Sequence, residues 1–224
     1  MERQPEPELM LDAEQARAYA EADFAEPHER IADDFLAAFP ELPAQGALLD
    51  LGCGPGDLTF RLARRLPGWR LHGVDGSPAM LRLARERLSR EPAAAGRIRL
   101  VTGHIPEVAL PESRYDVVFS NSLLHHLPDP TALWRAIRRW TASGGCVFVA
   151  DLFRPPSREA AAELVERYSA NEPAVLKRDF FHSLLAAFTP DEVRRQLTKA
   201  GLGHLTVRTV SDRHLTVSGR LPRR

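Results

Sequence analysis

The sequence predicts an α/β fold with a doubly wound, mostly parallel seven-stranded sheet that ends in an antiparallel C-terminal hairpin. From Ala47 onward, short apolar runs alternate with stretches of helical periodicity, which is typical of βαβ units. Near the C-terminus, two β-rich stretches are joined by only Ser211, Asp212 and Arg213, and so short a link favours a hairpin. The chain has 224 residues, which is long enough for one domain with a full core and a small cap.

An N-terminal helical cap is expected over residues 1–46. The spacing of apolar residues predicts two short amphipathic helices, Asp12–Phe24 and Glu26–Phe39, the second ended by Pro40. The first 50 residues contain 13 Asp and Glu residues against 3 Lys and Arg residues. An acidic segment of this kind argues against a polyanionic substrate.

Five short apolar runs follow the cap, and each predicts a strand. The runs cover residues 47–51, 69–75, 97–103, 115–121 and 144–152. Helices are predicted between them, the first over about residues 57–66. Ser77 is suited to cap the next helix, and Pro78 suits its first position. The helix before the fifth strand has an apolar stripe made of Leu133, Trp134, Ile137 and Trp140.

A helical lid insertion is expected at about residues 154–188, inside a main domain of residues 47–224. We expect most of its aromatic residues to form the core of the lid. These are Tyr168, Phe180, Phe181 and Phe188. Thr189 to Glu192 then form a capping box that starts a helix ending near Gly201. The two hairpin strands are expected within residues 204–210 and 214–221.

The composition indicates a globular protein without a strong charge. Lys and Arg number 30, as do Asp and Glu, so the net charge makes no case for nucleic acid or an anionic membrane. Cys53 and Cys146 are too few and too scattered for a disulfide framework or a zinc site, and no metal site is expected. The acidic first residues do not resemble a signal peptide and no apolar run reaches membrane-spanning length, so a cytoplasmic location is expected. Nothing in the sequence predicts an oligomeric state.

The stretch LLDLGCGPGD, Leu48 to Asp57, places three glycines directly after the first predicted strand. In a doubly wound sheet, ligands bind at the carboxyl ends of the strands. Gly52, Gly54 and Gly56 would let a ligand lie against the main chain, and the amides that open the next helix offer donors. Asp75 ends the second strand, where a carboxylate is suited to accept hydrogen bonds from ribose hydroxyls. The loop alone could be an ordinary turn, but together with Asp75 it indicates a nucleoside site.

The spacing of the loop separates two classes of nucleoside ligand. A dinucleotide loop has the pattern G-x-G-x-x-G, whereas this loop reads G-C-G-P-G with Asp50 two residues before its first glycine. A carboxylate there would repel a pyrophosphate but would receive an amino-acid ammonium group, directly or through water. With these residues the sequence resembles the class I S-adenosylmethionine-dependent methyltransferases, over about Ala47 to Leu152 and again in the closing hairpin.

The resemblance implies a Rossmann-like methyltransferase fold and S-adenosylmethionine as the cofactor. It implies that Asp50, Gly52 and Gly54 line the methionine portion and that Asp75 holds the ribose. The full set of cofactor-binding residues expected is Asp50, Gly52, Gly54, Gly56, Asp75, Gly76, His104, Ile105 and Asn121. The family often has an acidic residue where this chain has His104, so the adenine contact would involve backbone groups or a neutral imidazole. The alternative for His104 is an exposed loop histidine.

The fourth strand ends in SNSLLHHLPDP, Ser120 to Pro130, which in the family faces the transferable methyl group. Asn121, His125 and His126 are therefore the candidate catalytic residues, with Ser122 beside them. A histidine with a pKa near neutrality is suited to take a proton from a hydroxyl, thiol or amine. We expect only one of the adjacent histidines to face the ligand, with His125 preferred and the other packed or capping a helix. The pair is similar to that of the small-molecule group that includes the quinone-biosynthesis methyltransferases, and alignment of donor and acceptor alone would also suffice for catalysis.

Two further groups are expected at the same edge of the sheet. Asp151 and Arg154 follow the fifth strand, and Asp212 to His214 form the hairpin turn. Arg213 would either bind an acceptor carboxylate or phosphate or form a structural bridge to Asp212, and the bridge is preferred.

The resulting hypothesis is in-line methyl transfer from S-adenosylmethionine to a small-molecule acceptor through an O, N, S or C nucleophile. The acceptor itself is not predicted. The alternatives are a non-catalytic partner protein that keeps the fold, or a methyltransferase acting on RNA or protein. The neutral charge disfavours nucleic acid.

Overall fold

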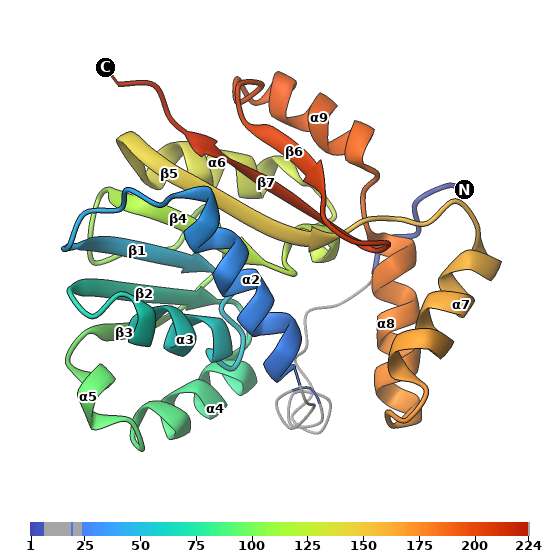
Figure 1. Ribbon diagram of the computed structural model, residues 1–224, viewed down its shortest axis with the longest axis horizontal. Coiled ribbons are helices and arrows are strands. Elements are labelled where there is room, and N and C mark those ends of the chain that lie inside the picture. The colour runs from blue at the N-terminus through green and yellow to red at the C-terminus, as the bar shows by residue number, and fades with distance from the viewer. Residues whose placement is uncertain (7–18, 20–23, 224) are drawn as a thin grey trace.

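The computed structural model describes residues 1–6, 19 and 24–223. Its described part contains a seven-stranded sheet with the strand order β3-β2-β1-β4-β5-β7-β6 (Figure 1). The strands are β1 (Gly46–Leu51), β2 (Trp69–Asp75), β3 (Ile98–Thr102), β4 (Tyr115–Asn121), β5 (Thr141–Leu152), β6 (Thr206–Thr209) and β7 (His214–Arg220). Strands β1 to β5 pair in parallel, and β7 is antiparallel to both β5 and β6. The predicted doubly wound sheet with its C-terminal hairpin is confirmed.

The strand order creates a crevice beside β1. The chain proceeds outward from β1 through β2 to β3 and then returns to β4 on the other side of β1. Asp50 in β1 accordingly pairs with Gly73 in β2 and with Phe119 in β4. Ligands in such sheets bind where the connections diverge, at the carboxyl ends of the strands. Since β6 runs parallel to β1, the turn from Asp212 to His214 also lies at this edge, as the sequence predicts.

Helices cover both faces of the sheet because alternate strand residues point to opposite sides. One face packs against α2 (Ala25–Ala38), α3 (Asp57–Arg65), α4 (Pro78–Leu88) and the short α5 (Pro92–Ala95). The other face packs against α6 (Thr131–Trp140) and α9 (Pro190–Lys199). In β1, Leu48 belongs to the first core and Leu49 to the second. The predicted helix Asp12–Phe24 lies outside the described residues except for Tyr19 and Phe24.

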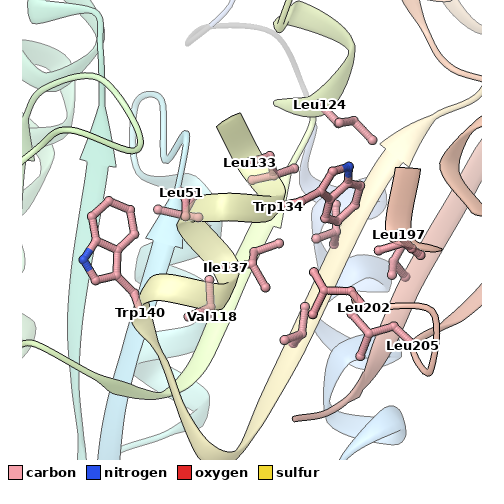
Figure 2. Close-up of a cluster of buried hydrophobic side chains, with 14 of the residues drawn as sticks. Leu51, Val118, Leu124, Leu133, Trp134, Ile137, Trp140, Leu197, Leu202 and Leu205 are labelled. Atoms are coloured by element: carbon pink, nitrogen blue, oxygen red, sulfur yellow. The ribbon is translucent and has the colours of Figure 1, made fainter. Parts of the chain in front are cut away.

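Figure 2 shows the core beneath α6. The apolar stripe expected from the sequence is fully buried there and meets residues of α9 and of the loop that follows it. Trp134 also donates its Nε1–H to Oε1 of Gln196 at 3.0 Å, which satisfies the buried indole. This packing fixes α6 against β4, which contributes Tyr115 and Val118 to the same core.

The lid insertion forms two helices, α7 (Arg158–Ser169) and α8 (Ala174–Ala186), which pack against each other beyond the carboxyl ends of the parallel strands (Figure 1). Their shared core consists of leucines and alanines, with Phe180 and Phe181 packed against it. Phe188 instead enters the main core, and Tyr168 is 44% exposed. Only two of the four aromatic residues therefore pack against the lid core, so the expectation that most of them form it is wrong. The reason is that Ala and Leu side chains already fill the narrow space between the helices.

Local signals placed the helix starts correctly. Ser77 accepts a hydrogen bond from the Met80 amide, and Thr189 and Glu192 form the reciprocal capping box. Strand β5 begins at Thr141 rather than Gly144, because Thr141 pairs with Tyr115 ahead of a register shift. No helix in the described ranges is both long and apolar enough to cross a bilayer.

Candidate functional site

A cavity of about 780 Å³ lies at the carboxyl edge of the sheet. Its walls come from the loops after β1, β2 and β4, from α2, α3 and α4, from the lid helices and from the hairpin turn. Seven of the predicted site residues line it. They are Asp50, Gly52, Gly54, Asp75, Asn121, His125 and His126. The structure therefore brings the glycine loop and the histidine pair into one cavity.

The three glycines of the loop serve different purposes. All have positive φ angles, +74° at Gly52, +53° at Gly54 and +83° at Gly56, which disfavours other residues. A Cβ added to Gly52 would lie 3.0 Å from Leu123, and one added to Gly56 would lie 2.6 Å from Phe60. A Cβ added to Gly54 would meet no atom of the described residues within 4 Å, apart from its two chain neighbours. Gly54 is thus the position where the bare backbone faces the cavity, whereas Gly52 and Gly56 permit internal packing.

Asp75 connects the glycine loop to the start of α4. Its Oδ2 accepts the Gly54 N–H and its Oδ1 accepts the Ser77 N–H, both at 2.8 Å. Burial raises the pKa of Asp75, and these two hydrogen bonds oppose the rise. The carboxylate therefore holds the loop in shape and still has acceptor capacity beside the cavity.

Asp50 lies at the floor of the cavity and is 2% exposed. Burial raises its pKa to about 7, with the charge of Asp75 contributing and the Thr59 hydrogen bond opposing. The Thr59 hydroxyl donates to Oδ2 of Asp50 at 2.6 Å. A buried carboxylate of this kind gains from a cation placed beside it, because the cation offsets the cost of ionisation.

The histidine pair lies on a short 3-10 turn, η1 (Leu124–His126), directly after β4. Nδ1 of His125 lies 2.6 Å from Oδ1 of Asp151, and Oδ2 of Asp151 accepts the Leu124 amide at 2.7 Å. The rings of His125 and His126 are 4.1 Å apart between centroids. Both histidines line the cavity. That only one of them faces a bound ligand stays a prediction.

The protonation of the two histidines differs. Burial acts to lower the pKa of His125, but the charge and hydrogen bond of Asp151 outweigh it and raise that pKa. Burial lowers the pKa of His126, and the neighbouring His125 lowers it further. The raised pKa thus favours the protonated form of His125, whereas the lowered pKa favours the neutral form of His126.

The loop between β4 and the histidine turn has a strained backbone at Ser122. Ser122 has a φ of +51°, in the left-handed region that a residue with a side chain rarely adopts, and it lines the cavity beside Asn121. The Ser122 amide donates to the Ala150 carbonyl at 2.9 Å, which holds the strained residue in place. Strain of this kind gathers at functional sites.

Four predicted cofactor residues do not form part of the cavity wall. They are Gly56, Gly76, His104 and Ile105. His104 is exposed, while Ile105 packs against the main core. Their roles stay predictions.

Arg154 follows the carboxyl end of β5, as expected, but it does not line the cavity. Its guanidinium is buried, donates to Glu192 at 2.8 Å and also donates to the Ala187 carbonyl. The same glutamate closes the capping box of α9, so Arg154 ties the lid exit to α9 instead of lining the cavity.

Sequence reasoning missed several wall residues, among them His28, Arg87 and Ser183. Tyr19 also lines the cavity and is partly buried against Met80; burial raises its pKa to about 12, so its hydroxyl stays protonated. Arg213 lines the cavity while bonded to Asp212 at 3.1 Å, with its guanidinium 3.3 Å from the centroid of the Tyr168 ring. The preferred bridge to Asp212 is thus confirmed. No local pattern reports such contacts, because they depend on how the lid packs.

Comparison with known proteins supports one family. Residues 49–147 match a family model described as a methyltransferase domain. A trans-aconitate 2-methyltransferase of Methylobacterium nodulans is 34% identical over 155 residues, which are 69% of this chain and 55% of that protein. An uncharacterized methyltransferase of Mycobacterium bovis is 30% identical over 165 residues, covering 74% of this chain and 80% of that protein. The chain spans about half the length of the trans-aconitate relatives it matches.

Solved structures share the fold. A SAM-dependent methyltransferase from Aquifex aeolicus has a TM-score of 0.67 at 15% identity, covering 92% of this chain and 98% of that one. The plantazolicin methyltransferase BpumL, solved with SAH and a triazolic substrate analogue, has a TM-score of 0.69 at 14% identity, with 94% and 90% covered. At such identities the similarity concerns the fold alone.

Proposed function

The chain belongs to the class I S-adenosylmethionine-dependent methyltransferases, and on that premise we propose that it methylates a small-molecule acceptor held beside His125 and His126. One observation carries the proposal. A single cavity joins the glycine loop and Asp75 to a pair of histidines backed by a buried carboxylate. Donor and acceptor bound in this cavity would be held close together, which is the main requirement of methyl transfer.

The residues of the loop suit the donor. The backbone at Gly54 faces open space, the Asp75 carboxylate has acceptor capacity for ribose hydroxyls, and buried Asp50 gains from an ammonium group nearby. When bound, S-adenosylmethionine would supply a methyl group on a positively charged sulfur. In this proposal, the cofactor-binding residues predicted from the sequence are kept as the residues that bind the donor.

The pH dependence of donor binding tests the role of Asp50. The pKa of Asp50 is about 7 in the free protein, and an ammonium group favours its ionised form, so binding below pH 7 must release a proton. We expect the affinity for S-adenosylhomocysteine to fall from pH 7.5 to 5.5, by up to about tenfold per pH unit. Calorimetry in buffers of different ionisation enthalpy measures both the affinity and the released proton.

Asp50→Asn is the matched variant, because asparagine keeps the shape and the contact with Thr59. It should bind S-adenosylhomocysteine more weakly at pH 7.5, and its affinity should change less with pH than that of the wild type. The pH dependence that remains would come from the nearby Asp75, whose pKa is also raised. An unchanged profile in Asp50→Asn would assign the titration to another group.

The histidine pair supports two actions toward an acceptor. His125, whose proton is favoured by Asp151, is suited to donate a hydrogen bond to an anionic oxygen. His126, whose pKa is lowered, is suited to take a proton from a hydroxyl or amine as it is methylated. The lid, with Phe180 and Ser183 in the wall, would exclude water and shape the acceptor pocket.

Transfer of a labelled methyl group tests the proposal directly. The protein would be incubated with methyl-labelled S-adenosylmethionine and separate sets of small carboxylic acids, phenols and amines. Trans-aconitate is the first acid to include, because relatives of this chain carry its name. We expect label in one class of small molecule, and loss of at least about 100-fold in kcat for His125→Asn.

Two results would redirect the assignment. Label in RNA or protein alone would favour a macromolecular acceptor. Tight donor binding without transfer to any acceptor, including a fractionated cell extract, would favour a non-catalytic partner protein.

A further inference from the structure

We propose that Glu6 is a positioning residue of the acceptor site, holding His126 by Nδ1 as Asp151 holds His125. This inference rests on the proposed function, because it takes the cavity to hold an acceptor. It concerns a residue from the N-terminal segment that no motif singled out. That segment, residues 1–6, reaches the site through contacts made by Arg3 and Gln4.

Arg3 anchors the segment between the lid and the histidine turn. One of its terminal nitrogens donates to the carbonyls of His125 at 2.9 Å and Leu127 at 3.0 Å, and its Nε donates to the Ala186 carbonyl. The guanidinium also lies 3.9 Å from the centroid of the Phe188 ring. The Gln4 amide adds a bond of 3.0 Å to the carbonyl of Leu185, at the end of α8. These contacts bring Glu6 next to the acceptor side of the cavity.

Glu6 contacts both the lid and the histidine pair. Its Oε2 lies 2.9 Å from Nδ1 of His126 and 3.3 Å from the Ser183 hydroxyl, which donates to it. Burial acts to raise the pKa of Glu6, but the contact with His126 outweighs it, so the carboxylate is ionised at neutral pH. Nδ1 of His126 is fully buried and makes no aligned hydrogen bond among the described residues, so its 2.9 Å contact with Glu6 is an ion-pair contact.

Each ring has a carboxylate at its Nδ1, Asp151 through a hydrogen bond of 2.6 Å and Glu6 through an ion-pair contact of 2.9 Å. Both rings line the cavity, whereas neither Asp151 nor Glu6 does, so each carboxylate stands behind its ring. A carboxylate at Nδ1 favours the tautomer that carries its proton there and leaves Nε2 with a lone pair. Nε2 of His126 is thereby the nitrogen left to take a proton, whereas His125 in its protonated form donates a hydrogen bond. If the acceptor loses a proton as the new bond to the methyl carbon forms, that proton passes to Nε2 of His126 and the Glu6 carboxylate stabilises the resulting imidazolium.

A metal ion fits this cluster less well. The potential ligand atoms of Glu6, His125 and His126 lie within 4.8 Å of one another. The rings, however, face each other at 4.1 Å, and Nδ1 of each lies against a carboxylate. Ligands of one ion instead direct their lone pairs at a common point. We therefore assign the cluster to the orientation and protonation of the histidines.

Other charged groups act on the same rings. Asp151 from β5 raises the pKa of both histidines, whereas Arg3 from the N-terminal segment lowers that of His125. Asp75 from β2 interacts with His126, and His214 from β7 interacts with His125. Glu6 raises the pKa of both rings, so its removal should lower them.

Glu6→Gln is the test variant, Glu6→Asp the rescue and Glu2→Gln the matched control. Glu2 is an exposed glutamate of the same segment, so its variant loses the same charge without the contact. In the kcat–pH profile, one limb reports the ionisation of the histidines. We expect the apparent pKa of this limb to fall by about one pH unit in Glu6→Gln. It should return toward the wild type in Glu6→Asp and stay unchanged in Glu2→Gln.

NMR titration of the imidazoles in the free protein provides a readout independent of activity. A lower pKa for His126 in Glu6→Gln, with unchanged affinity for S-adenosylhomocysteine, is the expected result. An unaltered imidazole titration in Glu6→Gln overturns the inference, even if activity falls. Failure of the wild type to bind S-adenosylhomocysteine overturns the proposed function instead, and the two failures are thus distinguishable.

Discussion

Replacing Gly54 with arginine is expected to remove S-adenosylhomocysteine binding while the protein stays folded. The Cβ of such a side chain would have no atom of the described residues beyond its chain neighbours within 4 Å, and since Gly54 lines the cavity, the side chain would extend into it. We expect affinity to fall by more than about 1,000-fold, because the side chain would occupy the space of the ligand. The φ of +53° adds a strain of about 1–2 kcal/mol, which corresponds to a melting temperature roughly 2–8 °C lower. Calorimetric titration and thermal unfolding measure the two effects.

Gly201→Arg is the control for backbone strain. Gly201 has a φ of +69°, is exposed and lies at the end of α9, away from the cavity wall. This variant should lose similar stability and keep the wild-type affinity. Equal loss of binding in both variants would mean that strain rather than the cavity governs the result.

Replacing Asp75 with alanine is expected to have the second largest effect. The variant loses the acceptor for the Gly54 and Ser77 amides and, in the proposed function, for the ribose hydroxyls. Hydrogen bonds to a charged group contribute about 1.5–3 kcal/mol each, so losing two of them to the ligand weakens binding by at least about 100-fold. Calorimetry with S-adenosylhomocysteine and with adenosine alone would show the loss for both ligands.

Asp116→Ala is the control for loss of a carboxylate that accepts a backbone amide. Asp116 accepts the Ala47 N–H at 2.8 Å at the opposite end of β1. Its variant should be less stable but bind the ligand normally. Wild-type affinity in Asp75→Ala would remove Asp75 from the donor site.

The parts of the fold that depend on local pattern could be predicted from the sequence. Strand β4 was predicted with its observed bounds, because an apolar run between polar residues leaves little choice of register. The α9 start followed from Thr189, Pro190 and Glu192, since a capping box is a contact within four residues. The family followed from Asp50, the glycine loop and Asp75, and the comparisons confirm it.

The parts of the site that depend on packing could not be predicted. Arg154 was placed correctly at the edge of the sheet, but its buried pairing with Glu192, 38 residues further on, could not be read from the sequence. Glu6 and His126 are separated by 120 positions, and no spacing rule connects them. Two of the relatives are named for trans-aconitate and none of those reported above for a quinone, so the similarity of the histidine pair to the quinone group stays a prediction.

A crystal structure of the protein with S-adenosylhomocysteine tests the central claim most directly. We expect difference density for the ligand in the cavity, with its ribose hydroxyls at Asp75 and its ammonium group toward Asp50. The anomalous peak of its sulfur should face His125 and His126. Density for the ligand elsewhere, or with its sulfur directed away from the histidines, would contradict it.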